Sequence, residues 1–361
     1  MSLTIPDPRN WLAFVPATLH TSPLYTQFWE HLQHDADLLP LLRLVDPDQP
    51  LPITFFTAVN FLVLGEPTDP LAQFYPYLQP EQTRPAADVY PFFRAFVLAH
   101  QETLREILPT ARLQTNEVTR CANLLPAFLL AHQRGGGQAL NMVEIGSSLG
   151  LQLRWHQYGY RYVRQQSATA LLVHNPLAPV QISCEIEGEA FPLTQATLLD
   201  ARVACCQGIE LCPRDLHDDT DTRWIRAAIW PEEVQRYRTL DAALAYAYRL
   251  MPPLVLQGDA ADLLPRLLAA IPTTHTAVVW HSYAVNQGPV EVKAAIEHHL
   301  LEASRRIPIY RVGLEVEPTA PLPQLTLTEY RAGQLVRHDI LAHCTVHGER
   351  MTWLMEQNTP A

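Results

Sequence analysis

The sequence has almost no lysine and no excess of positive charge. Lys293 is the only lysine, and the formal net charge of the 361 residues is −11. Chemistry that depends on a lysine amine is therefore excluded at every other position. Nucleic-acid binding normally requires a basic surface that neutralises phosphates, which an acidic chain does not favour. We therefore expect a small-molecule substrate and no nucleic-acid partner.

Long apolar runs are also missing. No segment approaches the roughly 18 to 20 consecutive apolar residues that a membrane-spanning helix needs. The first residues lack a basic stretch followed by an apolar core, the pattern of a secretion signal. We therefore expect a cytoplasmic protein with no membrane partner. The hydrophobic content of 48% is enough to fill a substantial core, which excludes global disorder.

The cysteines form no C-x-x-C pair, the spacing typical of zinc and redox sites. The six are Cys121, Cys184, Cys205, Cys206, Cys212 and Cys344. Adjacent residues of an extended strand point to opposite sides, so Cys205 and Cys206 cannot both face one ligand. We predict reduced cysteines in the core and no metal site.

Helical periodicity dominates residues 1–137. Ser22 and Pro23 are typical of a helix N-cap and first turn. Apolar residues recur at helical spacing after them and again over 55–62, 92–104 and 118–129. The last stripe stops at three glycines, 135–137, through which no helix would continue. We predict an all-helical N-terminal region of four or five helices that acts as a cap.

Residues 138–361 alternate between short apolar segments and helical segments, which favours an α/β domain with a parallel sheet and crossover helices. The predicted strands cover 139–145, 203–211, 253–257, 277–281 and 309–316, and the main predicted helices cover 260–270 and 290–306. Two segments around a turn at 332–333 predict a C-terminal antiparallel hairpin, over 324–330 and 335–347.

Two insertions interrupt this alternation, at about 155–202 and 212–252. The first contains strand candidates at 171–173 and 181–186, which would form a hairpin that extends or covers the sheet. The second contains a helical stretch over 224–248 that includes Trp230. The Trp230 side chain could form a cleft wall, but a tryptophan before proline is more often packed in a core.

A turn of small residues follows the first predicted strand. Glu144, Gly146, Ser147, Ser148 and Gly150 lie in it or beside it. Small residues let the backbone turn sharply and let a ligand approach the amides at the start of the next helix, where partial positive charge gathers. We therefore predict that these five residues bind a nucleotide-like cofactor. Small residues also occur in turns that bind nothing, which is the alternative interpretation.

The same turn also fits the pattern G-x-S-x-G, in which Ser148 would be the nucleophile of a serine hydrolase. In such hydrolases several strands precede the nucleophile. Here the preceding residues are predicted to be helical and the strands follow. The order of predicted elements therefore favours cofactor binding.

Acidic residues end two later strands. The Glu210 carboxylate could accept hydrogen bonds from a ribose diol, with Glu185 and Glu187 as alternative acceptors. Glu210 could also be a solvated carboxylate at the sheet edge. The Asp259 side chain could accept from an adenine amino group, cap the following helix, or do both.

The candidate catalytic residues lie in two segments. His281 ends a predicted strand and could act as general acid or base, because only histidine titrates near neutrality without help. A structural histidine is the alternative. Asn116, Glu117 and Arg120 precede the first strand and could hold the substrate. Alternatively, Thr115 caps a helix there and the charged residues form salt bridges.

Taken together, these segments resemble the class I S-adenosylmethionine-dependent methyltransferases. The glycine turn is similar to the first motif of that fold, and the strand ends at 208–211, 258–260 and 278–282 are similar to the ends of its second, third and fourth strands. The resemblance implies a Rossmann-like methyltransferase-type sheet and S-adenosylmethionine as the cofactor. It also implies catalysis mainly by positioning of the reactants.

Nearly the full chain more specifically resembles the bacterial proteins of the domain of unknown function 2332 family. The segments that carry this resemblance are 114–120, 143–151, 208–216, 223–224, 230–232, 258–259 and 281–282. That family usually has Gly-Ile-Asp-Leu-Asn-Pro where this chain has Glu210 and Cys212, which moves the acidic acceptor by about one methylene. The resemblance to this family gives no reaction. Together with the methyltransferase-like segments, we expect a methyltransferase for a small molecule or, alternatively, a non-catalytic binding or scaffold protein that retains the fold.

Overall fold

The chain forms two compact units, and each is built from two separate stretches of sequence. The computed structural model describes residues 21–164, 170–188, 191–193, 201–317, 320 and 322–354. The helical unit comprises residues 1–115 and 217–238, and the sheet unit comprises residues 116–216 and 239–361. Residues 116–137, which the sequence grouped with the N-terminal helices, thus belong to the sheet unit.

Short helices around an aromatic core form the helical unit. Its elements are α2 (Pro23–Leu32), α3 (Leu39–Leu42), α4 (Leu51–Gly65), η1 (Pro70–Phe74), η2 (Ala86–Asp88), α5 (Tyr90–Ala99), α6 (Gln101–Ile107) and α9 (Asp219–Ala227). Ser22 caps α2 as predicted, because its side chain accepts a hydrogen bond from the Tyr25 amide. The apolar stripe over 92–104 forms two helices, α5 and α6, that meet at His100.

Residues 217–238 are part of the core of the helical unit. The fully buried Asn60 side chain donates hydrogen bonds to the carbonyls of Ala227 and Ile229, at 2.9 and 3.1 Å, and to the Tyr237 hydroxyl at 2.9 Å. The Trp230 ring packs against Tyr25, with 5.5 Å between ring centroids. Trp230 is therefore a packing residue of this unit, the second of the two interpretations from the sequence.

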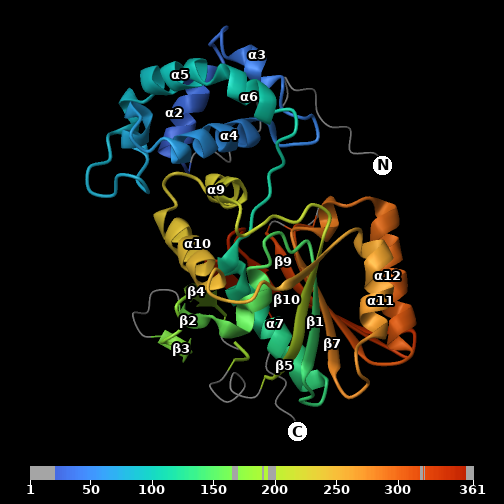
Figure 1. Cartoon of the computed structure of the whole chain (residues 1–361). Helices are drawn as coiled ribbons and strands as arrows, with labels where there is room; N and C mark the ends of the chain where they lie inside the picture. The colour runs from blue at the N-terminus through green and yellow to red at the C-terminus, as the bar shows by residue number, and fades with distance from the viewer. Residues whose placement is uncertain are drawn as a thin grey trace. The chain divides into compact units, whose positions relative to one another are not determined.

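One mixed sheet of eleven strands runs through the described part of the sheet unit (Figure 1). Its order is β3-β2-β4-β11-β10-β9-β8-β7-β1-β5-β6. The strands are β1 (Leu140–Ile145), β2 (Gly159–Arg164), β3 (Ala170–His174), β4 (Gln181–Glu187), β5 (Val203–Glu210), β6 (Leu254–Gln257), β7 (Thr276–Ser282), β8 (Ile309–Glu315), β9 (Gln324–Arg331), β10 (Gln334–Cys344) and β11 (Arg350–Trp353). The five strands β6, β5, β1, β7 and β8 are parallel neighbours.

Helices cover both faces of the parallel strands, as the alternation of side chains shows. Ala277 and Val279 of β7 belong to the apolar cluster formed with α11 (Ala260–Ala269) and α12 (Val290–Ser304). Trp280 of β7 points to the other face and contacts Phe128 of α7 (Cys121–Arg134), with 5.4 Å between ring centroids. Figure 1 shows α7 and the α11–α12 pair on different sides of β1 and β7.

The antiparallel part of the sheet confirms one prediction and revises another. β9 and β10 form the predicted C-terminal hairpin, with Ala332 and Gly333 in the left-handed turn that a two-residue hairpin loop favours. The two strands predicted in the first insertion, β3 and β4, extend the sheet but do not pair with each other. Instead β2, which the sequence did not predict, lies between them. β11 is a further unpredicted strand.

The thiols are free as predicted, but not all of them lie in the core. Cys121, Cys184 and Cys344 are buried, whereas Cys205 and Cys212 are exposed. The prediction of core positions is therefore wrong for these two. Among the residues that the structure describes, no cluster of side chains could hold a metal ion, and no helix is long and apolar enough to cross a membrane.

Candidate functional site

The candidate site lies at the carboxyl ends of the parallel strands. β1 has β7 on one side and β5 on the other, so the parallel strands β5 and β6 lie on one side of it and the later strands β7 and β8 on the other. Open α/β sheets bind ligands at such a switch point, in the crevice outside the carboxyl ends of the strands. The predicted residues of 144–150, 210, 259 and 281 lie at or just after the carboxyl ends of β1, β5, β6 and β7, and therefore share this edge of the sheet.

The glycine turn after β1 has the backbone conformation that its small residues predict. Gly146 and Gly150 have φ angles of 80° and 72°, and Ser148 has a φ angle of 49°. Gly146 is exposed, although the residues on both sides of it are buried. A Cβ atom on Gly146 would lie 2.4 Å from the Ala284 Cβ. Only glycine therefore fits this position, for two separate reasons.

The helix predicted after this turn is short. Residues 152–157 form η4 (Gln152–Gln157), a single stretch of 3₁₀ helix. Its first side chain, Gln152, donates a hydrogen bond to the Glu117 carbonyl at 2.8 Å. The turn is therefore held mainly by contacts from other elements, and a helix N-terminus contributes little to it.

Glu210 at the end of β5 contacts the glycine turn directly. Its carboxylate accepts a hydrogen bond from the Ser148 amide at 2.8 Å and another from the Cys212 amide at 3.2 Å. Glu210 is buried, as is Glu144 of β1. Burial and the charge of Glu210 raise the pKa of the Glu144 carboxyl well above its usual value. Glu144 is thus a core carboxyl behind the turn.

The alternative acceptors for a ribose, Glu185 and Glu187, lie elsewhere in the sheet. Both belong to β4, which pairs with β2 and β11 and is separated from β5 by six strands in the sheet order. Glu185 pairs with Arg350 at 3.0 Å. Neither residue can reach the glycine turn, so Glu210 is the acidic residue of this site.

The segment before β1 meets the glycine turn, as the sequence suggested. The buried Asn116 side-chain amide donates a hydrogen bond to the Ser147 carbonyl at 3.1 Å. Glu117 accepts from the Thr119 hydroxyl at 2.6 Å and lies 3.7 Å from His347. Arg120 belongs to η3 (Val118–Arg120), immediately before α7. Asn116 and Glu117 therefore hold this segment against the turn and the C-terminal strands.

Arg120 reaches the end of the neighbouring strand β7. Its guanidinium group donates to the Val346 carbonyl at 3.0 Å and lies 3.5 Å from the Ser282 hydroxyl. The same group stacks on the Tyr283 ring, 4.0 Å from the ring centroid. Tyr283 has a φ angle of 56°, which is uncommon for a bulky residue. No sequence pattern predicted Tyr283 as a site residue, because a positive φ angle leaves no pattern in a sequence.

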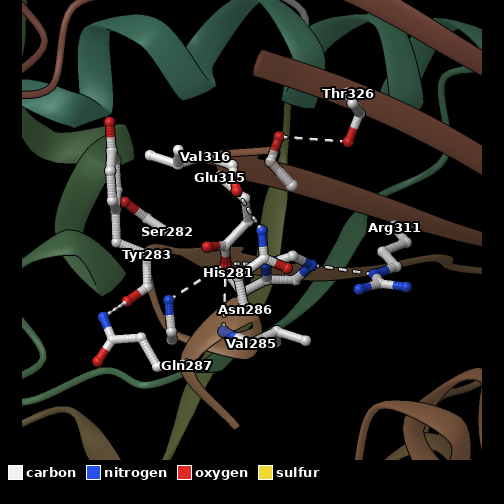
Figure 2. Close-up of polar contacts among 12 residues, drawn as sticks. His281, Ser282, Tyr283, Val285, Asn286, Gln287, Arg311, Glu315, Val316 and Thr326 are labelled. Atoms are coloured by element: carbon white, nitrogen blue, oxygen red, sulfur yellow. Dashed lines mark hydrogen bonds and ion pairs between the residues drawn. The ribbon is translucent and has the colours of Figure 1, made fainter. Parts of the chain in front are cut away.

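His281 is the centre of a buried network. Its Nδ1 atom lies 2.6 Å from a Glu315 carboxylate oxygen, and Nε2 accepts from the Arg311 Nε–H at 2.9 Å (Figure 2). Since Arg311 can only donate, the proton of the neutral imidazole is on Nδ1 and points to Glu315. Burial lowers the pKa of His281. Both ring nitrogens are thus engaged, as in a structural histidine.

Asp259 after β6 caps the next helix. Its side chain accepts a hydrogen bond from the Ala261 amide at 2.8 Å, at the start of α11. This is the capping role that the sequence offered as one of two compatible interpretations. The adenine contact remains a prediction.

Several buried polar atoms around the glycine turn have no hydrogen-bond partner. These atoms are Asn116 Oδ1, Ser147 Oγ, Ser148 Oγ, Gln152 Oε1 and Tyr283 Oη. Buried polar groups in folded proteins are nearly always paired, with protein, water or a ligand. Among the residues that the structure describes, five such atoms lie around this turn.

Comparison with known proteins adds a family to this geometry. A family model described as "Uncharacterized protein conserved in bacteria (DUF2332)" matches residues 15–353. The matched range includes every residue of the site. No curated protein matches the chain.

Proposed function

The chain belongs to the domain of unknown function 2332 family, and from the geometry of its site we propose that it binds S-adenosylmethionine and methylates a small molecule. The observation that carries the proposal is the contact between two strand ends. The Glu210 carboxylate at the end of β5 lies against the turn after β1, next to the exposed backbone of Gly146. A nucleoside needs such an acidic acceptor for its ribose and such an open turn for close approach.

The residues present fit this ligand. Each oxygen of a carboxylate can accept more than one hydrogen bond, so Glu210 can take a ribose hydroxyl while it holds the Ser148 amide. The buried Ser147 and Ser148 hydroxyls have no partner, and they lie in the turn that the ligand would cover. Asp259 can accept from an adenine amino group with the carboxylate that also caps α11.

The strand order supports the same proposal. Among the five parallel strands, β1 comes first in the chain and lies in the middle. The next two in the chain, β5 and β6, lie on one side of it, and the last two, β7 and β8, lie on the other. Together with an antiparallel neighbour, β9, this order supports a Rossmann-like methyltransferase-type core. The strands beyond β9 are additions to that core.

Bound S-adenosylmethionine supplies a methyl group on a positively charged sulfur. The protein then has to hold the acceptor in line with that methyl group and to exclude water, so that positioning provides much of the rate enhancement. Asn116, Arg120 and Tyr283 lie beside the turn on the β7 side and form one wall of the proposed ligand site. His281 supports the loop after β7 from within the core.

A non-catalytic binding or scaffold protein is the second candidate. The observation that favours it is that three predicted site residues already have structural roles. Glu210 binds two backbone amides, Asp259 caps α11, and His281 is bonded to Glu315 and Arg311. A serine hydrolase finds less support, because Ser148 Oγ has no partner among the described residues and His281 is bonded elsewhere.

Isothermal titration of the full chain with S-adenosylmethionine and S-adenosylhomocysteine tests the proposal. We expect both to bind, and we expect Glu210→Ala to weaken both while Glu210→Asp retains binding. The exposed Glu291 of α12 provides the matched control, Glu291→Ala. Absence of binding by either compound at millimolar concentration to a folded protein would leave the non-catalytic candidate.

A further inference from the structure

Tyr283 occupies a strained position beside the glycine turn. It directly follows β7, its φ angle is 56°, and its hydroxyl is buried without a partner. The next residue, Ala284, packs against Gly146. A left-handed conformation is costly for a bulky side chain and persists only where the surroundings enforce it. Such positions cluster at functional sites.

A buried carboxylate holds the loop that contains Tyr283, together with a hydrogen bond from the Tyr283 amide to the Leu314 carbonyl at 3.0 Å. One oxygen of Glu315 accepts hydrogen bonds from the amides of Ala284 and Val285, at 3.1 and 3.2 Å, and lies 2.6 Å from His281 Nδ1. Figure 2 shows the Tyr283 ring pointing away from His281 and Glu315. The network therefore fixes the backbone of Tyr283 while its ring and hydroxyl point elsewhere.

Two donors lie together at the Tyr283 ring, and an acceptor belongs to the segment that carries Arg120. The Arg120 guanidinium group stacks on the Tyr283 ring at 4.0 Å, so a cation and a phenol hydroxyl lie together. Asn116 uses its amide hydrogens on the Ser147 carbonyl, which leaves its Oδ1 atom as a buried acceptor without a partner. A guanidinium and a hydroxyl are complementary to a carboxylate, and an amide oxygen is complementary to an ammonium group.

We propose that Arg120, Tyr283 and Asn116 form a subsite for the amino-acid end of the nucleoside ligand. Arg120 and Tyr283 donate hydrogen bonds to its carboxylate, and Asn116 Oδ1 accepts from its ammonium group. The inference rests on the proposed function, because Glu210 on the β5 side fixes which end of the ligand is the ribose. Since β1 lies between β5 and β7, the opposite end extends over Gly146 toward this subsite.

Two ligands that differ only in the amino-acid group test the subsite. S-adenosylhomocysteine carries the amino acid, whereas 5′-methylthioadenosine has the same nucleoside and sulfur with a methyl group instead. We expect calorimetry of the full chain to show tighter binding of S-adenosylhomocysteine. Arg120→Gln and Tyr283→Phe should each reduce its affinity about tenfold or more, the range expected when hydrogen bonds to a charged group are lost. Both variants should leave 5′-methylthioadenosine binding unchanged.

Controls separate a binding role from a structural one. Arg305→Gln changes an exposed arginine of the same charge and should change neither affinity. Tyr283→Phe removes one oxygen atom and leaves the fold intact, so it keeps the inference testable if Arg120→Gln unfolds. Equal loss of both ligands in Tyr283→Phe would show a structural role and overturn the subsite.

The outcomes for the two proposals are distinguishable. If neither compound binds the wild-type chain, the proposed cofactor fails and the subsite with it. If both bind with the same affinity, the nucleoside site stands and the amino-acid subsite is wrong.

Discussion

The Glu210 carboxylate holds the Ser148 amide at 2.8 Å, and this hydrogen bond joins the end of β5 to the turn that follows β1. The two residues are 62 positions apart in the chain, and both are buried. The bond fixes a turn in which Ser148 has a positive φ angle. The Glu210 side chain at the end of β5 thus shapes the backbone of the turn that follows β1.

Removal of this carboxylate should loosen the turn. In Glu210→Ala the amides of Ser148 and Cys212 lose a charged acceptor, and we expect the free energy of unfolding to fall by about 1.5–3 kcal/mol. Urea denaturation measures the loss, and amide hydrogen exchange should show faster exchange at Ser148. Glu291→Ala on the exposed face of α12 is the matched control. Unchanged protection of Ser148 in Glu210→Ala would contradict this role.

The contact between Gly146 and Ala284 predicts a coupled pair of substitutions. Gly146→Ala should be destabilising through both the φ angle of 80° and the clash of its Cβ with Ala284. The conformational part alone is about 1–2 kcal/mol. In the Ala284→Gly background, Gly146→Ala should cost only this conformational part of the free energy of unfolding. Denaturant titration of the four proteins gives the coupling energy, and strictly additive effects would show that the clash relaxes without cost.

His281 predicts a decrease in stability on acidification. Burial lowers its pKa below the unfolded value of about 6.5. Below pH 6.5 the unfolded chain therefore binds a proton that the folded chain resists, so this contribution is present above that pH and is lost as the pH falls. We expect His281→Gln to show a shallower decline of the thermal midpoint between pH 7 and pH 5 than the wild type.

The control for His281 is the exposed His298 of α12. His298→Gln should keep the wild-type pH dependence. His281→Gln should also lower stability at pH 8 by about 1–3 kcal/mol, because Glu315 and Arg311 lose a buried partner. An unchanged pH profile in His281→Gln would show that the histidine does not resist protonation.

Asn60 should be essential to the helical unit. In Asn60→Ala the Ala227 carbonyl loses its Asn60 donor, at a cost of about 1–3 kcal/mol, while the Ile229 carbonyl keeps the Tyr237 hydroxyl as its donor. Limited proteolysis should then cleave within residues 217–238 faster than in the wild type. The partly exposed Gln33, the C-cap residue of α2, serves as the control, Gln33→Ala. Equal cleavage rates in Asn60→Ala and the control would contradict an anchoring role.

The parallel strands and the position of the site could be predicted from the sequence, because both leave local patterns. Short apolar runs between helical segments predicted β1, β5, β6, β7 and β8. The polar residues that end these runs had to share one edge of a parallel sheet. The sequence predicted only that Asn116 lies near the candidate site. The structure shows that its side-chain amide donates a hydrogen bond to the Ser147 carbonyl.

Long-range pairing and backbone strain could not be predicted from the sequence. β11 pairs in parallel with β4, whose residues lie more than 160 positions earlier in the chain, and β2 lies between β3 and β4, an order that local patterns do not show. The strained φ angle of Tyr283 depends on Glu315, which comes from another strand. Likewise, the place of residues 217–238 in the helical unit depends on Asn60, more than 160 positions earlier. These features depend on tertiary contacts that no local pattern encodes.

The helical unit is discontinuous, and this has a consequence for biosynthesis. Trp224 and Ala227 complete an apolar core whose other members lie between residues 24 and 111. A ribosome therefore releases β1 to β5 before the last pieces of that core exist. The apolar faces of the N-terminal helices therefore stay incompletely buried while part of the sheet is synthesised. An N-terminal fragment that stops before residue 217 should accordingly be prone to aggregate.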